Sequence, residues 1–173
     1  MELLEKANAK ATFFLLGKHI DQNRDLARKI IEKGHLIGEH SYYHTHPWKC
    51  NPIISANDLI KGWKSVRKID KKFRSKYFRP PYGKFNLITF IYILFWRKKV
   101  VFWTEDPKDY MITNIDTFLE NDLGKIKTGS VVLIHDGRAR RDENPNTTID
   151  ALQAILEKSD RYKIKCQSVD NIY

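Results

Sequence analysis

The amino-acid sequence predicts an α/β protein built as an incomplete (β/α) barrel. Short apolar segments typical of strands alternate along the chain with longer segments whose apolar residues have helical spacing, and this alternation is typical of a parallel sheet covered by helices. Polar side chains follow several predicted strands in turn, as in barrels with an active site at the carboxyl ends of their strands. No glycine-rich phosphate-binding motif follows the first predicted strand, which argues against a dinucleotide-binding fold.

The first half of the chain shows this alternation most clearly. Residues 11–17 (ATFFLLG) are a short aromatic and apolar run that ends in glycine, which predicts a strand. Residues 25–34 have helical apolar spacing and end in glycine, which predicts a helix. Residues 35–41 (HLIGEHS) predict the next strand, and residues 55–73 predict a helix that Ser55 caps.

The second half continues the same pattern. Strands are predicted at residues 77–83, 99–107, 130–137 and 162–169. Helices are predicted at residues 87–96, 115–126 and 146–159. The apolar run at residues 87–96 is well short of the roughly 20 residues that span a bilayer, so we expect a buried helix and no membrane span. No linker or repeat divides the chain, so residues 1–173 are predicted to form a single domain.

The composition is that of a basic globular protein. The 173 residues include 31 Lys and Arg against 21 Asp and Glu, a formal net charge of +10. Such a charge suits nucleic acid, anionic lipid or an anionic cell wall, although dispersed charges more often mark solvated surface. The aromatic residues lie in apolar segments instead of between basic residues, so no nucleic-acid partner is expected. Cys50 and Cys166 are too far apart for a metal knuckle, and each is expected to be a lone thiol.

Two histidines follow the strand predicted at residues 35–41. His40 and His44 stand four positions apart in the segment HSYYH. Imidazole nitrogens are common ligands of divalent metals, so this pair could hold one. Two histidines in a loop could equally have a structural role, and His46 is a spare candidate.

Other strand ends carry groups suited to acyl-transfer chemistry. Arg79 in RPPYG could hold a carboxylate in a bidentate pair, and a backbone N–H beyond the prolines could stabilise an oxyanion. A plain tight turn is the alternative at this point. His135 follows another strand and could be a general acid if a carboxylate fixed its tautomer. Asp106 is predicted to be that carboxylate, whereas Asp109 is expected to cap a helix or a turn.

Taken in order, these segments resemble the polysaccharide deacetylases of carbohydrate esterase family four, which share the NodB-homology domain. The matching segments are ATFFLLG, GHLIGEHSYYH, FRPPYG, VVFWTEDPKDY and GSVVLIHDG, and together they cover nearly the whole chain. The resemblance implies a distorted barrel with a reduced number of β/α units. It also implies a metal-dependent hydrolase that removes N-acetyl groups from an amino-sugar polymer or oligomer, such as peptidoglycan or chitin, at the cell envelope.

The resemblance also implies roles for individual residues in metal binding and catalysis. His40 and His44 would be metal ligands, most often for zinc, and Arg79 would orient the catalytic base. A metal in such a site polarises the acetyl carbonyl and lowers the pKa of a bound water. His135 would be the general acid that protonates the leaving amine, tuned by Asp106.

Further residues would form the substrate pocket by the same resemblance. The backbone N–H of Tyr82 would hold the oxyanion that develops on the acetyl group. Trp103 and Leu133 would line the pocket for the acetyl methyl group, and Pro81 would also bind substrate.

The chain departs from the family pattern in the first motif. The family segment TFDDGP supplies the base aspartate and a third metal ligand, and no Asp-Asp pair occurs in the 173 residues. We therefore expect the first strand and both aspartates to be missing, either because the chain is a fragment of an active deacetylase or because it is a carbohydrate-binding relic. Glu39 is not expected to replace a ligand, because neighbouring side chains on a strand point to opposite faces. Tyr110 stands where the family has tryptophan.

Overall fold

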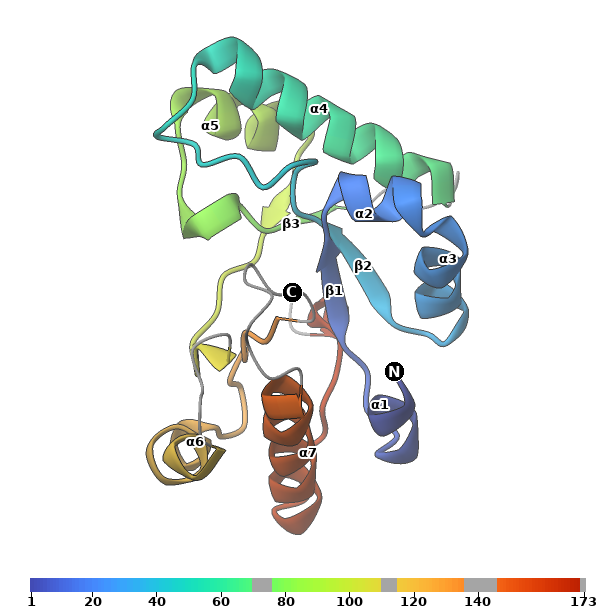
Figure 1. Ribbon diagram of the computed structural model, residues 1–173, viewed down its shortest axis with the longest axis vertical. Coiled ribbons are helices and arrows are strands. Elements are labelled where there is room, and N and C mark those ends of the chain that lie inside the picture. The colour runs from blue at the N-terminus through green and yellow to red at the C-terminus, as the bar shows by residue number, and fades with distance from the viewer. Residues whose placement is uncertain (70–75, 110–114, 136–145, 172–173) are drawn as a thin grey trace. The chain divides into compact units, whose positions relative to one another are not determined.

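The computed structural model describes residues 1–69, 76–109, 115–135 and 146–171, which are drawn as ribbons in Figure 1. The chain divides into two compact units. The sheet unit comprises Lys10–Val101 and Ser168–Tyr173, and the second unit comprises Met1–Ala9 and Phe102–Gln167. The sequence predicted a single domain over residues 1–173, and the division into two compact units does not test that prediction.

A four-stranded parallel sheet forms the centre of the sheet unit, in the order β1-β2-β3-β4. Its strands are β1 (Thr12–Leu15), β2 (Leu36–Glu39), β3 (Tyr77–Phe78) and β4 (Lys99–Val100). Leu15 pairs with Glu39, and Glu39 pairs with Phe78. Because all pairs are parallel, the carboxyl ends of the strands lie along one edge. The predicted α/β class with a parallel sheet is confirmed.

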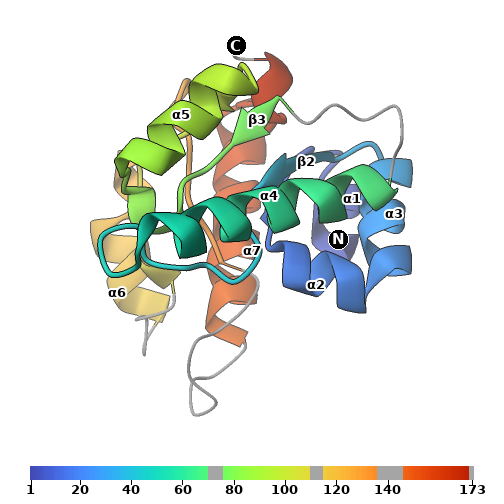
Figure 2. The same cartoon turned by 90° about the horizontal axis from the view of Figure 1, so that it is seen from above.

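Helices connect these strands in the sheet unit. They are α2 (Gly17–Gln22), α3 (Arg24–Glu32), α4 (Pro52–Ile69) and α5 (Leu87–Phe95), with short 3₁₀ turns η1 (Pro81–Gly83) and η4 (Val169–Asn171). Leu59 of α4, Phe78 of β3 and Tyr92 of α5 form one buried cluster. Figures 1 and 2 show α4 and α5 side by side over this cluster.

Helix α4 begins three residues before the predicted start. The side chain of Asn51 accepts a hydrogen bond from the backbone N–H of Ile54 at 2.9 Å, which satisfies a free donor at the helix start. Pro52 occupies the first helical position, where its missing N–H costs nothing. The prediction that Ser55 caps this helix is wrong, because Ser55 is buried inside it.

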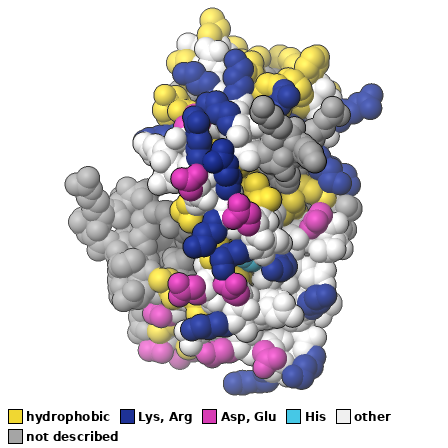
Figure 3. Space-filling view, turned by 90° about the vertical axis from the view of Figure 1, so that its right-hand side faces the viewer, with side chains coloured by type: hydrophobic (Ala, Val, Ile, Leu, Met, Phe, Trp, Pro, Cys, Tyr) yellow, Lys and Arg dark blue, Asp and Glu magenta, His cyan; other side chains and the backbone are white. Residues whose placement is uncertain are grey.

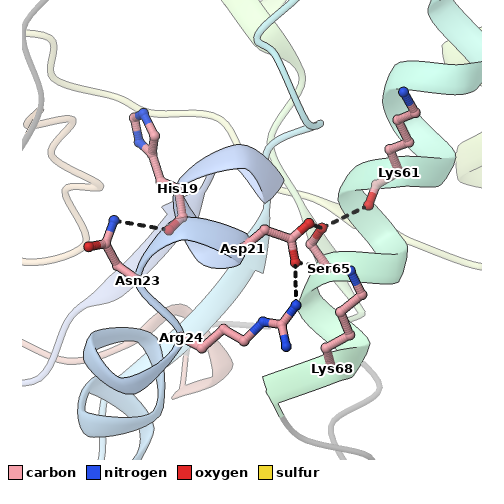
Figure 4. A network of polar contacts seen from close by, with 7 residues as sticks. All are labelled: His19, Asp21, Asn23, Arg24, Lys61, Ser65 and Lys68. Carbon is pink, nitrogen blue, oxygen red and sulfur yellow. Dashed lines mark hydrogen bonds and ion pairs between the residues drawn. The ribbon is translucent and has the colours of Figure 1, made fainter.

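Polar contacts join α2 to α4 beside the apolar core (Figure 4). The Asp21 carboxylate accepts hydrogen bonds from Ser65 Oγ at 2.9 Å and from Lys68 Nζ at 3.0 Å. Arg24 Nη2 lies 3.5 Å from the same carboxylate. Burial alone would raise the pKa of Asp21, but the hydrogen bonds from Lys68 and Ser65 lower it below its usual value.

The second unit is mainly helical. It contains α1 (Glu2–Lys6), α6 (Ile115–Asn121), the 3₁₀ turn η3 (Leu123–Lys125) and α7 (Asn146–Arg161). Its core is built by Phe118, Ile126, Ala151 and Ile155. Strands were predicted at residues 99–107 and 130–137. The structure forms β4 at the start of the first of these ranges and, further on, an isolated parallel bridge between Glu105 and Val132. Residues 136–137 lie outside the described part of the chain.

The strand predicted at residues 162–169 does not form. Lys163 adopts a left-handed backbone conformation with φ of 56°, which interrupts an extended segment. The backbone N–H of Ile164 donates to the carbonyl of Ser159 at 2.8 Å, so this segment begins by closing the end of α7. At the end of this segment, the backbone N–H of Val169 donates to Thr12 Oγ1 of β1 at 3.0 Å, which is a side-chain contact and not a ladder hydrogen bond. Cys50 and Cys166 are both free thiols, as predicted.

Helix α5 is not buried as the sequence predicted. Its sides facing the cluster of Leu59 and Phe78 are covered, but Leu87, Phe90, Ile91, Leu94 and Phe95 are all exposed. Within the described residues, no helix has both the length and the apolar character needed to cross a bilayer. On the face drawn in Figure 3, Lys and Arg form a band that Asp and Glu interrupt, as expected for solvated charge.

The close contact between α4 and the loop after β2 yields a first prediction. A Cβ added at Gly62 would lie 2.6 Å from the carbonyl carbon of Ser41 and 2.7 Å from its oxygen. Gly62→Ala should therefore lower the free energy of unfolding by about 1–3 kcal/mol despite the better helix propensity of alanine. The measurement is urea denaturation.

Gly124 supplies the matched control. A Cβ at Gly124 would meet nothing within 4 Å, so Gly124→Ala should change stability by less than about 0.5 kcal/mol. Equal stability of the two variants would show that α4 does not need to approach Ser41 this closely.

Candidate active site

His40 lies directly after β2, with its ring fixed by the next strand. Its Nδ1 lies 2.7 Å from the carbonyl oxygen of Arg79, which can only accept, so Nδ1–H is the donor. This hydrogen bond leaves the lone pair of the neutral ring on Nε2. A carbonyl partner of this kind is typical of metal-ligating histidines.

His44 lies four residues on in a loop that turns back on itself. Its backbone is left-handed, with φ of 63°, and its N–H donates to Ser41 Oγ at 3.2 Å. The rings of His40 and His44 are 4.8 Å apart between centroids, at an interplanar angle of 62°. The loop thus brings the two predicted ligands together.

Asp58 of α4 holds this loop in place. Its carboxylate accepts backbone N–H donors from Tyr42 at 3.2 Å, Tyr43 at 2.6 Å and Thr45 at 3.2 Å. Asp58 is buried, so these three bonds replace the water that the carboxylate loses. Asp58 was not predicted from the sequence to belong to the site. Its signal was an acidic residue on the apolar face of the helix, directly before Leu59.

The His40–His44 pair fits two ligands of a divalent ion. Two imidazole nitrogens about 2 Å from a tetrahedral zinc place their ring centroids roughly 5 Å apart, close to the spacing seen here. Zinc sites normally have three or four protein ligands. The described residues include no group of three His, Cys, Asp or Glu side chains that could hold a metal. The pair therefore fits a metal as part of a ligand set.

Arg79 is buried beneath the same strand ends. Its Nε donates to the carbonyl of Val101 at 3.2 Å, and its guanidinium lies 4.2 Å from the centroid of the Phe14 ring. These two contacts hold the Arg79 guanidinium in place against the sheet. The carboxylate partner predicted for Arg79 stays a prediction.

The RPPYG turn presents Tyr82 beside the histidines. Pro81 is buried, whereas Tyr82 has a left-handed backbone with φ of 56° and an exposed ring. That ring lies 4.5 Å from His44 and 4.7 Å from His46, between centroids. His46, the spare ligand candidate, thus packs against the same Tyr82 ring as His44. Trp48 continues the cluster, 6.1 Å from His46.

The second unit contains a separate histidine–carboxylate pair. His135 Nδ1 lies 2.8 Å from Asp109 Oδ1, and the backbone N–H of His135 donates to Asp109 Oδ2 at 2.9 Å. Thr148 Oγ1 donates to the same Oδ2 at 2.9 Å. Burial alone would raise the pKa of the fully buried Asp109, but these hydrogen bonds lower it below its usual value.

The prediction that Asp106 is the partner of His135 is therefore wrong. Asp106 accepts a hydrogen bond from the backbone N–H of Lys108 at 3.0 Å and closes a local turn. Lys108 is left-handed, with φ of 51°, and this turn directs the next residue, Asp109, into the core. The two acids therefore have the opposite roles to those predicted.

Comparison with known proteins identifies the chain. The family model of polysaccharide deacetylases matches residues 1–93. The chain belongs to the polysaccharide deacetylase family.

Relatives of this deacetylase-family chain align with most of its length. Two peptidoglycan-N-acetylglucosamine deacetylases of Bacillus cereus are each 30% identical to it, over 156 and 158 residues, which are 90% of the chain in both cases. The chain spans 55% of the length of the first relative and 71% of the second.

Solved structures share the fold. A peptidoglycan N-acetylglucosamine deacetylase, solved with a hydroxamate-type ligand, has a TM-score of 0.86 at 27% identity, over 99% of this chain and 78% of that chain. A pseudoenzyme of carbohydrate esterase family four from Bacillus anthracis has a TM-score of 0.81 at 25% identity, over 98% of this chain and 57% of that chain. The predicted deacetylase-type (β/α) fold is confirmed.

The two residues predicted to line the acetyl pocket lie in the second unit of this family member. Leu133 is buried, and its N–H donates to the carbonyl of Glu105 at 2.9 Å. Trp103 is half-buried, with its ring 6.2 Å from that of Phe102. Their contact with an acetyl group stays a prediction. Tyr110, beside Asp109, lies outside the described residues.

Glu39 points away from the metal-ligand candidates, as the strand alternation predicted. It is buried, with Lys98 Nζ 2.7 Å away, and Tyr92 Oη donates to it at 2.6 Å. Burial raises the pKa of Glu39 despite the opposing effect of Lys98 and Tyr92. The Glu39 carboxylate is therefore bound within the core and does not serve as a further metal ligand beside His40 and His44.

The buried position of Asp109 yields a prediction about acid stability. Because its folded-state pKa is lowered, its charge stabilises the fold fully above the ordinary carboxyl pKa of about 4, and this contribution disappears as the pH falls through the lower folded value. Asp109→Asn should cost about 2 kcal/mol of unfolding free energy at pH 7, because it removes a charged acceptor from a buried network. The difference from wild type should shrink on acidification.

Urea denaturation from pH 7 to below pH 4 measures this difference. Asp160→Asn is the matched control, since Asp160 is 88% exposed and its contact with Lys163 spans 3.8 Å. A pH-independent gap between Asp109→Asn and wild type would contradict the lowered pKa of Asp109.

Proposed function

We propose that this chain is a metal-dependent deacetylase that removes N-acetyl groups from N-acetylglucosamine units of a peptidoglycan- or chitin-like polymer, at the cell envelope. The observation that carries the proposal is the convergence of His40 and His44, with His40 held in one tautomer by the Arg79 carbonyl. Family membership and the peptidoglycan deacetylases among the relatives support the substrate class.

His40 and His44 would hold the metal, with zinc as the first candidate. A divalent metal, when bound, supplies Lewis acidity toward the acetyl carbonyl and a bound water. The backbone N–H of Tyr82 would donate to the oxyanion that forms on that carbonyl. The buried guanidinium of Arg79 would orient the carboxylate that takes the proton from water.

His135 would supply the proton for the leaving group. With Nδ1–H of His135 donated to Asp109, the transferable proton would be carried by Nε2. As the carbon–nitrogen bond breaks, that proton would pass to the sugar nitrogen and leave a free amine. Asp109 would act as a positioning residue that keeps the ring in this orientation.

A second candidate is a carbohydrate-binding protein without catalytic activity. It is favoured by the lack of an Asp-Asp pair in the 173 residues and of a three-ligand group among the described ones. The similarity to a pseudoenzyme shows that the fold itself does not require activity. Both candidates share a sugar polymer as the partner, so acetate release and metal binding separate them.

Acetate release from N-acetylglucosamine oligomers and from peptidoglycan tests catalysis directly. We expect release that requires a divalent metal and that His135→Ala lowers by about 100-fold or more, because general acid catalysis has at least this magnitude. His19→Ala is the matched control, since His19 is an exposed residue of α2, and it should keep full activity. Sugar binding without any acetate release in the presence of metal would favour the second candidate.

Zinc titration by calorimetry tests the ligand pair. Wild-type protein should bind zinc with a dissociation constant of about 1 μM or tighter, and both His40→Gln and His44→Asn should weaken binding by 10-fold or more. Asparagine is chosen at position 44 because it tolerates the left-handed backbone there. Unchanged affinity in both variants would place the metal elsewhere, and His19→Ala again serves as the control.

A further inference from the structure

Helix α5 presents a continuous apolar face to its surroundings. Five residues at positions i, i+3, i+4, i+7 and i+8 are each between 51% and 76% exposed: Leu87, Phe90, Ile91, Leu94 and Phe95. This spacing places them on one side of the helix. A contiguous set of large exposed apolar side chains often marks a site where a protein binds a partner or a membrane.

The opposite side of α5 is fixed in the core, so the exposed side cannot turn inward. Thr89 and Tyr92 are buried, and Tyr92 donates to the buried Glu39 at 2.6 Å. Thr89 also contacts the helix cap, since its N–H and its hydroxyl both donate to Asn86 Oδ1 at 2.8 Å. Rotating the helix would break the contact between Tyr92 and Glu39.

Both ends of this apolar face carry a tryptophan and a cation. Before the helix, the Trp48 indole N–H donates to the Phe85 carbonyl at 2.6 Å, and Lys84 Nζ lies 4.2 Å from the Trp48 ring centroid. After the helix come Trp96 and the exposed Arg97, followed by the exposed Lys99. Trp48 is 65% exposed and Trp96 is 37% exposed.

The neighbouring helix α4 extends the apolar surface near its start. Ile53 and Ile54 of α4 are 72% and 49% exposed. Ser55 Oγ accepts from Asn86 Nδ2 at 3.1 Å, so the starts of α4 and α5 are adjacent. The rings of Trp63 and Trp96 lie 4.3 Å apart, so the two helices also contact one another further along.

We propose that the α5 face, defined by Leu87, Phe90, Ile91, Leu94 and Phe95, lies in the interface of an anionic lipid membrane. Leucine and phenylalanine on one side of a helix, with tryptophan and basic residues at its ends, are the features of a helix that lies in the plane of a bilayer interface. The chain does not span the membrane in this arrangement. The proposal is independent of catalysis.

Charge decides between a membrane and a second copy of the chain. Two molecules with a net charge of +10 each repel one another, and the basic residues that flank α5 in the chain, Lys84, Arg97 and Lys99, add to this repulsion in a pairing through α5. An anionic lipid surface attracts the same cations, each contributing about fivefold in affinity near the surface. The same face that disfavours self-association therefore favours anionic lipid.

Co-sedimentation with lipid vesicles tests the proposal on the wild-type chain. Binding to vesicles containing phosphatidylglycerol should exceed binding to pure phosphatidylcholine vesicles by at least about tenfold, and high salt should reduce that preference. Arg97→Gln with Lys99→Gln should weaken binding to the anionic vesicles by about 25-fold and leave binding to phosphatidylcholine unchanged.

A matched pair of double variants separates the α5 face from general surface hydrophobicity. Leu94→Gln with Phe95→Gln should lower vesicle binding by at least about tenfold, because two large apolar side chains no longer leave water. Leu26→Gln with Ile149→Gln replaces exposed apolar residues of α3 and α7, 53% and 50% exposed, and should bind vesicles as wild type does. Circular dichroism and thermal melting should show all variants folded as wild type.

Two outcomes would overturn the proposal. One is equal binding of wild type and the α5 double variant to phosphatidylglycerol vesicles, or no binding by either. The other is a wild-type dimer in sedimentation equilibrium that the α5 double variant converts to a monomer, without vesicle binding by wild type. That result would assign the α5 face to a second copy of the chain, whereas acetate release reports separately on the proposed activity.

Discussion

The buried contact between Glu39 and Lys98 determines how the sheet unit is arranged around its strand ends. A carboxylate that is 2% exposed requires partners, and Lys98 Nζ at 2.7 Å and Tyr92 Oη at 2.6 Å provide them. Removing one partner of such a buried pair typically costs about 3–5 kcal/mol, because the other charge is left without compensation. The end of β2, helix α5 and the start of β4 are therefore constrained together.

This constraint also explains the placement of the metal-ligand candidates. Glu39 is the last residue of β2, where alternate side chains point to opposite faces, so the core contact of Glu39 directs His40 to the other side. The Arg79 N–H donates to the Glu39 carbonyl at 2.9 Å, and the Arg79 carbonyl accepts from His40. One register of β2 against β3 thus satisfies the core and orients the imidazole.

Tyr92 links the same core contact to the outer surface of α5. Because Tyr92 must reach Glu39, the helix presents Leu87, Phe90, Ile91, Leu94 and Phe95 outward. A helix that is apolar on all sides is usually fully buried. Here one side packs within the unit and the other side is exposed among the described residues, which is the physical basis for assigning the exposed side to lipid.

The sequence predicted much of this architecture because its signals are local. The alternation of strands and helices can be seen in short windows of the sequence. The HSYYH pair and the RPPYG turn are also short patterns, and each follows directly after a strand in the structure. The predicted partner of His135 was wrong because Asp106 and Asp109 both follow the same apolar segment. The left-handed backbone of Lys108 decides which acid enters the core, and the sequence pattern does not specify that turn.

The burial of one helix and the formation of one strand were also predicted wrongly from the sequence. Apolar residues at 87–96 predict a helix, but burial depends on which neighbouring elements cover it. The alternating residues 162–169 likewise form no strand, because the left-handed backbone of Lys163 interrupts the extended conformation that ladder hydrogen bonds require.

The order of short motifs in the chain was enough to indicate the polysaccharide deacetylase family and the α/β class, and it predicted His40, His44 and His135 as groups suited to chemistry. The folded chain decided which carboxylate holds His135 and that Asp58 fixes the HSYYH loop. It also decided that α5 exposes one apolar face. Each of these depends on contacts between residues far apart in the chain, or on a single backbone turn, because burial and hydrogen bonding are properties of the folded surroundings and not of a local pattern.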